Sequence, residues 1–142
     1  MATITGTNKN DILNAEDGVT EEQDFIFGKQ GKDHLFGLGG DDFLNGGQGK
    51  DQLTGGEGAD TFVFTKGSGK DTIMDFEVGV DMIQIAKGGF KGIKDADDVA
   101  KHAKELKNGD VEINLGKGTK IVLKGVDIDH VKQHADEYFD VV

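Results

Sequence analysis

Apolar and polar residues recur with a period of nine along the first 84 residues. Four units follow one another from residue 28 to residue 63 without insertion: GKQGKDHLF, GLGGDDFLN, GGQGKDQLT and GGEGADTFV. Less regular units flank them at residues 6–14, 19–27, 66–74 and 76–84. In all eight units the sixth position is Asp and the eighth is a large apolar residue, so the pattern predicts a structural repeat rather than a low-complexity tract.

Each column of the repeat predicts a local structure. The glycine-rich first half of a unit reverses the chain, because glycine adopts positive φ without a Cβ clash. The last three residues are extended and direct the eighth side chain inward. Two units then form one coil of a right-handed parallel β-roll, a solenoid with a narrow apolar core. The predicted core residues are Leu13, Ile26, Leu35, Leu44, Leu53, Phe62, Ile73 and Ile83.

Stacking of the turns places acidic side chains close together. Each sixth-position Asp faces the Asp two units later, and two such carboxylates repel unless a divalent cation lies between them. Carboxylate and carbonyl oxygens favour Ca²⁺, whereas zinc prefers Cys or His and Mg²⁺ requires a tighter octahedron. About four sites are expected, with one or two more at the ends. The predicted pairs are Asp24 with Asp42, Asp33 with Asp51, Asp42 with Asp60, and Asp51 with Asp71.

These units resemble the RTX nonapeptides of the hemolysin-type calcium-binding family, which occurs in type I secreted toxins, proteases, lipases and alginate epimerases. The resemblance spans residues 6–84 and is best at 46–63; it weakens where Lys9 and Glu22 replace the fourth glycine and Lys66 and Phe76 replace the first. It implies the calcium-site residues Asp24, Gly28, Gly31, Asp33, Gly37, Gly40, Asp42, Gly46, Gly47, Gly49, Asp51, Gly55, Gly56, Gly58, Asp60, Gly69 and Asp71. Asp75 and Asp81 are interpreted either as a terminal site or as solvated turn residues.

The net charge of −11 agrees with cation binding and argues against nucleic-acid binding. Residues 19–81 carry thirteen acids and five bases, whereas residues 82–142 carry eleven and ten, so the excess negative charge lies with the glycines. There is no cysteine to form disulfides, and the first ten residues lack the pattern of a signal peptide. No apolar run approaches membrane-spanning length.

The nonapeptide period ends near residue 84, which divides the chain into a roll (1–84) and a small α+β cap (85–142). Helical spacing predicts a helix over residues 95–107, with Asp95 as its N-cap. Alternation predicts a hairpin of residues 111–115 and 120–126, and a short helix follows near 129–135. The acidic and then apolar tail, residues 136–142, resembles a type I secretion signal; a final strand would have the same pattern.

We find no catalytic motif in the sequence and expect a non-enzymatic protein. His130 and His134 share a predicted helix face, and we interpret them as surface residues. The main hypothesis, since Met1 opens the chain, is a small bacterial calcium-binding protein exported by type I secretion machinery. One alternative is a C-terminal folding and secretion module of a larger enzyme, toxin or adhesin. Another is a module that binds glycans or a polysaccharide, although the seventh positions form no uniform aromatic or threonine ladder.

Overall fold

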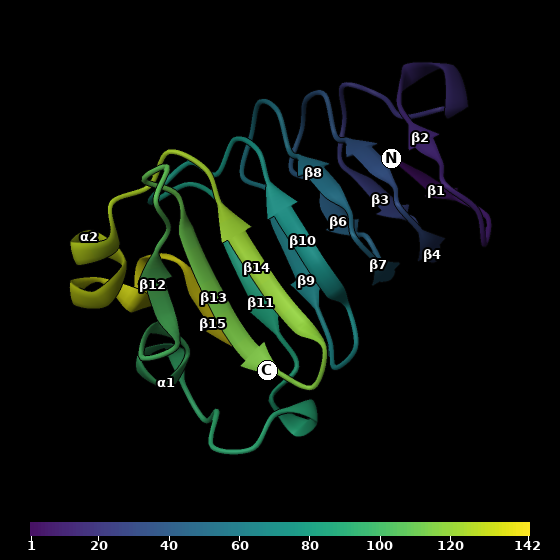
Figure 1. Cartoon of the computed structure of the whole chain (residues 1–142). Helices are drawn as coiled ribbons and strands as arrows, with labels where there is room; N and C mark the ends of the chain where they lie inside the picture. The colour runs from purple at the N-terminus through teal and green to yellow at the C-terminus, as the bar shows by residue number, and fades with distance from the viewer.

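The computed structural model describes all 142 residues, and the nonapeptides wind into a parallel β-roll made of two facing sheets (Figure 1). The six-stranded sheet runs β1 (Ala2–Thr5), β3 (Asp24–Phe27), β6 (Phe43–Asn45), β9 (Thr61–Phe64), β11 (Met82–Ile85), β15 (Phe139–Val141). The seven-stranded sheet runs β12 (Ala103–Glu105), β13 (Val111–Gly116), β14 (Thr119–Leu123), β10 (Gly69–Ile73), β8 (Gln52–Thr54), β5 (His34–Phe36), β2 (Ile12–Leu13). The predicted fold is confirmed.

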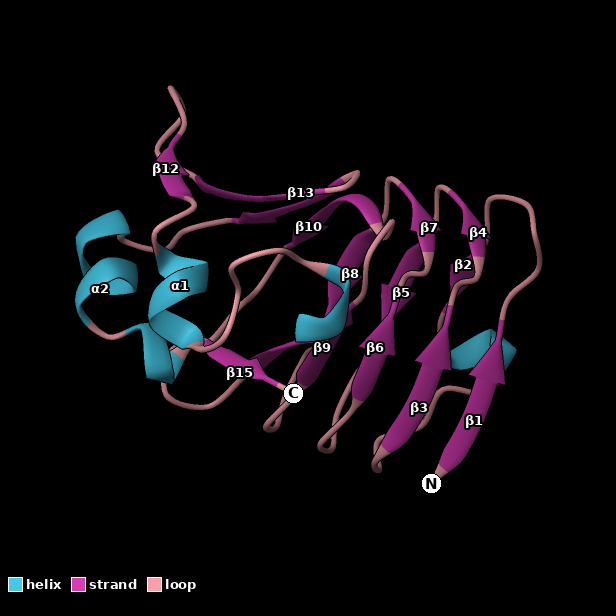
Figure 2. Cartoon of the chain, turned by 90° about the horizontal axis from the view of Figure 1, so that it is seen from below, coloured by secondary structure: helices cyan, strands magenta, loops and turns pink.

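Consecutive units alternate between the sheets, so strands two units apart in sequence lie side by side. In the six-stranded sheet Ile26 is in register with Leu44, and Leu44 with Phe62. The turns stack in the same way: β4 (Gln30–Gly31) pairs with β7 (Gln48–Gly49) along one edge of the roll (Figure 2). Successive turns are therefore held about 4.8 Å apart, the ordinary distance between paired strands.

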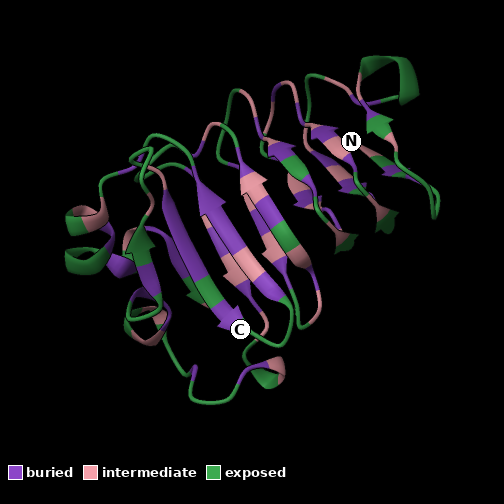
Figure 3. Ribbon diagram, viewed as in Figure 1, coloured by how far each residue is buried: buried purple, intermediate pink, exposed green.

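The eighth-position residues form the core of the roll, as predicted. Ile26, Leu35, Leu44, Leu53 and Phe62 have no exposed surface, whereas the residues on either side of them are partly or fully exposed, so that burial alternates along the strands (Figure 3). Each sheet contributes one such residue per strand. The roll consequently has a core only two side chains wide, which agrees with the low apolar content of the chain.

The C-terminal segment extends both sheets of the roll. Strand β14 pairs in parallel with β10, and β15 pairs in parallel with β11. The predicted hairpin is present as β13 and β14, joined through Lys117 and Gly118, both of which have positive φ. The remaining short elements, several of which cover this end of the molecule, are η1 (Ala15–Asp17), η2 (Lys87–Gly89), α1 (Ala96–Ala100), α2 (Ile128–Gln133) and η3 (Ala135–Glu137).

The prediction of one helix over residues 95–107 was wrong beyond its first turns. Helix α1 begins at the predicted N-cap, where the Asp95 side chain accepts the N–H of Asp98, but it ends at Ala100. Ala103 instead begins strand β12, which pairs antiparallel with β13 and places Ala103 opposite Ile113. Helix propensity is a weak preference, and pairing with the open edge of β13 overrides it.

The roll and the C-terminal segment share one hydrophobic cluster of 28 buried residues. Phe76 from the end of the roll stacks on Tyr138 from the C-terminal tail, with ring centroids 5.3 Å apart. Tyr138 and Phe139 are buried, and Phe139 lies in register with Ile83. The tail is therefore a structural strand, the second of the two interpretations of its sequence.

Candidate metal centre

The sixth-position aspartates form two columns, one along each edge of the roll. One column contains Asp24, Asp42, Asp60 and Asp81, and the other contains Asp11, Asp33, Asp51 and Asp71. Within each column the backbone N–H of one Asp donates to Oδ1 of the Asp in the next coil, over distances of 2.8 to 3.0 Å. The four predicted same-edge pairs are thus neighbours in space.

The second carboxylate oxygen of five aspartates has no hydrogen-bond partner. These atoms are Oδ2 of Asp33, Asp42, Asp51, Asp60 and Asp71, and all five residues are buried. A buried acceptor without a partner costs about 1–3 kcal/mol, and more if it is charged. The same feature in five successive turns indicates that a group absent from the polypeptide satisfies these oxygens.

In the four units from residue 28 to residue 63, the first glycine leaves a small space beside this oxygen. A Cβ added to Gly28 would lie 2.5 Å from Oδ2 of Asp33 and 2.6 Å from the carbonyl oxygen of Gly46 in the next coil. Gly37 stands in the same relation to Asp42 and to the carbonyl of Gly55. The requirement for glycine therefore comes from a small space bounded by a carboxylate and a backbone carbonyl.

Burial makes the charged form of these aspartates unfavourable. It raises the pKa of Asp42 and of Asp51 to about 6, of Asp60 to about 7 and of Asp71 to about 8. Neighbouring carboxylates add to the effect, as Asp24 does for Asp42. A cation beside Oδ2 would reverse the balance, because an adjacent positive charge favours the carboxylate over the acid.

The oxygens available fit calcium better than they fit other common metals. No group of three or more His, Cys, Asp or Glu side chains gathers around one point, so a bound metal must also use backbone carbonyls. Calcium accepts six to eight oxygen ligands of mixed type, including carbonyls. Zinc prefers sulfur and nitrogen ligands, whereas the atoms beside the first glycines are carboxylate and carbonyl oxygens. The residues present therefore fit Ca²⁺.

The two acids predicted as a terminal site, Asp75 and Asp81, have structural contacts. Both oxygens of Asp75 accept backbone N–H groups, from Gly55 at 2.9 Å and Gly56 at 2.8 Å. Asp81 is 2% exposed and accepts the N–H of Asp60 and of Glu77. The two acids therefore match neither interpretation made from the sequence, a terminal metal site or solvated turn residues. Both accept hydrogen bonds from the backbone of neighbouring turns.

His130 lies in α2 and His134 directly follows the end of this helix, and their rings stack with centroids 4.4 Å apart. Nδ1 of His130 is 3.0 Å from the Tyr138 hydroxyl, and both rings face Glu137 at 3.7 to 3.9 Å. Both side chains are partly exposed. Their contacts join α2 to the buried tail.

A family profile described as the RTX calcium-binding nonapeptide repeat matches the chain in four copies, over residues 3–19 and 27–62. These repeats belong to the RTX family. The matched RTX segments contain the turns that end at Asp11, Asp33, Asp42, Asp51 and Asp60. The resemblance stated from the sequence is confirmed, together with the calcium-binding character of the repeat.

Three solved structures resemble nearly the whole chain. The extracellular lipase LipA from Serratia marcescens matches with a TM-score of 0.73 and 25% identity, over 96% of this chain and 20% of the lipase. The AlgE6R3 and AlgE6R2 subunits of the Azotobacter vinelandii mannuronan C5-epimerase match with TM-scores of 0.68 and 0.64 and identities of 29% and 28%. The chain covers 80% and 90% of those subunits, which cover 96% and 95% of it.

The chain thus spans a fifth of the lipase but most of each epimerase subunit. A comparison with curated protein sequences finds no significant match. None of the helices is long and apolar enough to cross a membrane.

Proposed function

We propose that this protein is a secreted calcium-binding β-roll that folds when Ca²⁺ enters its turns. The observation that carries the proposal is the set of five buried Oδ2 atoms without partners. The matching family model describes a calcium-binding repeat, and the space beside Gly28 and beside Gly37 is bounded by a carboxylate and a carbonyl oxygen. Coupling to folding follows from energetics, because the stacked turns exist only in the folded chain.

The charge balance supports this coupling. Residues 19–81 carry a net charge of −8, and about four Ca²⁺ ions supply an equal positive charge. Without that charge, successive aspartates within each column repel one another, as Asp42 and Asp81 do with Asp60. Extracellular modules bind calcium at about 10⁻⁴–10⁻³ M, so the roll would stay unfolded at cytosolic calcium and fold outside the cell.

A calcium titration in a chelated, metal-free preparation tests the proposal. We expect the far-ultraviolet circular dichroism to change cooperatively from a disordered to a β spectrum, with magnesium at equal concentration giving a much smaller change. Equilibrium dialysis with metal analysis gives the number of ions bound. A full β spectrum in chelator that calcium leaves unchanged would show that the apolar core is sufficient.

We also propose that the protein acts by binding rather than by catalysis. The buried acids of the roll are the turn aspartates, and the buried acid of the C-terminal segment, Glu112, is paired with Lys70 and Lys104. Each therefore has a role in the fold. The S. marcescens lipase, five times the length of the matched segment, supports the alternative that such a roll serves a larger secreted partner.

Export by a type I secretion machinery remains part of the proposal. The supporting observations are the RTX repeats and the acidic-then-apolar tail. Because Tyr138 and Phe139 are buried in the folded protein, the tail would be accessible to an exporter only before calcium-dependent folding. Deletion of residues 138–142 should abolish secretion by a type I exporter in a heterologous host; undiminished secretion would contradict the role of the tail.

A second candidate function is binding of a linear acidic polysaccharide. Lys32, Lys50 and Lys70 occupy the fifth position of successive units on one edge, and Lys120 continues the row in register with Lys70. Beside them lies a hollow lined by Lys32, His34, Lys50, Asp51, Gln52 and Thr72. One lysine per coil matches a chain with one carboxylate per sugar, and the epimerase neighbours belong to an enzyme named for mannuronan.

Affinity electrophoresis in gels that contain a polyuronate tests this second function at saturating calcium. Retardation should be lost when Lys32 and Lys50 are both changed to Gln. The matched control is Lys87→Gln with Lys91→Gln, since these lysines lie outside the row. Equal mobility of all three proteins would exclude the row as a binding surface, and retardation by polyphosphate alone would indicate nonspecific attraction.

A further inference from the structure

The eight turns of the roll fall into two classes that differ in backbone conformation at the second position. In five turns, called the regular turns below, this residue has positive φ: Lys29 (81°), Leu38 (75°), Gly47 (83°), Gly56 (94°) and Gly67 (84°). In the other three turns it is Thr7, Thr20 or Glu77, none of which has positive φ. Side chains other than glycine rarely adopt positive φ, so its presence at Lys29 and Leu38 shows that the regular turn imposes it.

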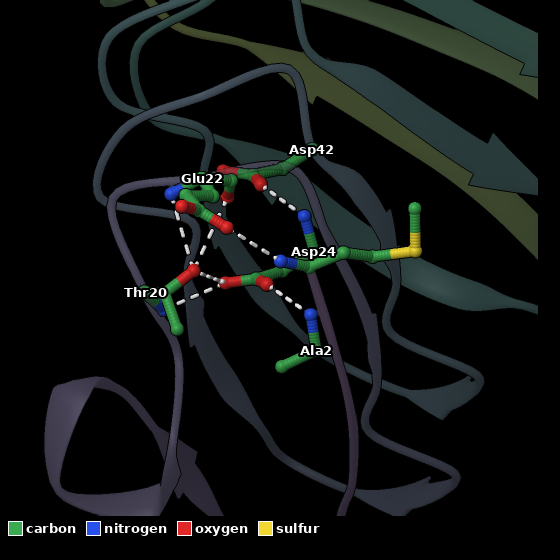
Figure 4. A network of polar contacts seen from close by, with 6 residues as sticks. Ala2, Thr20, Glu22, Asp24 and Asp42 are labelled. Atoms are coloured by element: carbon green, nitrogen blue, oxygen red, sulfur yellow. Dashed lines mark hydrogen bonds and ion pairs between the residues drawn. The ribbon is translucent and has the colours of Figure 1, made fainter.

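Turns of the second class are closed by their own hydrogen bonds. The backbone N–H of Thr20 donates to Oδ2 of Asp24 at 2.6 Å, and the Thr20 hydroxyl contacts the same oxygen at 2.9 Å (Figure 4). Thr7 makes the same two contacts with Asp11, again at 2.6 and 2.9 Å. In the last turn the N–H of Glu77 donates to Oδ2 of Asp81 at 2.9 Å.

The threonine hydroxyl also binds the backbone at the fourth position, where Lys9 and Glu22 stand in place of the glycine of the repeat. It accepts the backbone N–H of the fourth residue, from Lys9 to Thr7 and from Glu22 to Thr20, each at 3.1 Å. The hydroxyl proton is thereby directed to the carboxylate. Two N–H groups and one O–H group now point into the turn, and the positive ends of these dipoles oppose a cation there.

The division by backbone conformation coincides with the division by carboxylate contacts. The five aspartates whose Oδ2 has no partner end the five turns with positive φ at the second position. Asp11, Asp24 and Asp81, which end the other three turns, have both oxygens engaged by N–H or O–H donors. For Asp11, the contact to the second oxygen, Oδ1, comes from the Thr7 hydroxyl at 3.2 Å.

We propose that the turns ending at Asp11, Asp24 and Asp81 are closures that bind no metal, and that calcium binds only within the five regular turns between them. This inference rests on the proposed calcium binding. A hydroxyl and an amide take the place of the cation at the first coil, and an amide alone does so at the last turn. The metal-binding segment is therefore bounded at both ends by turns that need no calcium.

Counting bound calcium in variants tests the inference. Asp24→Asn should bind as many ions per chain as the unaltered protein, whereas Asp42→Asn, the matched variant in a regular turn of the same column, should lose at least one. Equilibrium dialysis at saturating calcium with metal analysis measures the count, and circular dichroism verifies that each variant is folded.

A gain of a site is a sharper test, since it does not depend on a damaged fold. Thr7→Gly with Lys9→Gly changes residues 6–11 to GGNGND, and Gly6 already lies beside Oδ2 of Asp11 and the carbonyl of Gly28. This variant should bind one additional ion. Thr7→Ser, which keeps the hydroxyl, should bind none in addition.

The outcomes separate the two proposals. If the unaltered folded protein binds no calcium, the proposed function is wrong. If it binds calcium and Asp24→Asn loses an ion, or if Thr7→Gly with Lys9→Gly gains none, the division into two classes of turn is wrong while calcium binding by the roll stands.

Discussion

The roll and the C-terminal segment bury acidic side chains in opposite ways. In the roll, burial raises the pKa of Asp60 to about 7, and its Oδ2 has no partner. In the C-terminal segment Glu112 is 4% exposed, and burial alone would raise its pKa, but Lys120, Lys104 and Lys70 bring the pKa below its usual value. Glu112 is thus neutralised by lysines of the protein itself, two from the C-terminal segment and Lys70 from the roll, whereas under the proposed function the regular turns take their cation from solution.

The largest expected effect of this difference follows removal of calcium. In chelator, amide hydrogen exchange should become fast throughout residues 28–85, because successive aspartates within each column then repel one another. The sheet formed by β12, β13 and β14 should keep more protection, since three strands with an apolar face and α2 against them retain a core. Exchange measured by mass spectrometry checks this. Equal protection of both regions without calcium would remove the distinction between them.

The glycine beside each carboxylate provides the next test. In Gly46→Ala the new Cβ meets the carboxylate of Asp51, so calcium affinity should fall at least tenfold and the folding midpoint should move to higher calcium. Gly88→Ala is the matched control, because a Cβ there meets nothing within 4 Å. The midpoint of the calcium titration gives the comparison, and equal midpoints for the two variants would contradict a metal-sized space beside Gly46.

Acid should partly replace calcium in the roll. The folded pKa values of Asp42, Asp60 and Asp71, about 6, 7 and 8, lie above the unfolded value of 3.8. The metal-free fold therefore binds more protons than the unfolded chain, and it loses stability as the pH rises from about 4 to 8. In chelator, the β signal should increase when the pH is lowered from 8 to 5. A signal that decreases over this range would contradict the assigned protonation.

The smallest effect is expected in the C-terminal segment. Lys104 lies 3.5 Å from Glu112 and is largely exposed, so Lys104→Gln should lower the stability of the calcium-loaded protein by about 0–1 kcal/mol. The number of bound ions should not change. Urea unfolding at saturating calcium measures the difference, and a lost ion would show that the lysine cluster and the calcium turns are coupled.

Much of the candidate metal centre was predictable from the period alone. The invariant sixth and eighth positions predicted both the buried column of Leu44 and Phe62 and the adjacency of Asp42 and Asp60, because a period of nine leaves little freedom once strands stack in register. The degenerate turns were less predictable. Thr7 and Thr20 both occupy the second position beside a non-glycine fourth residue, a signal that was visible but had no meaning without hydrogen-bond geometry.

By itself the sequence determined the roll, its core and the calcium-binding character of its repeats, since these depend on residue type at a repeated spacing. Only the tertiary structure decided the end of helix α1 at Ala100, the burial of the tail and the contacts of each carboxylate oxygen. The physical reason is that these features depend on partners remote in sequence. Ala103 becomes a strand because β13 offers an open edge, and an aspartate oxygen is satisfied or unpartnered according to the φ angle of a residue four positions before it.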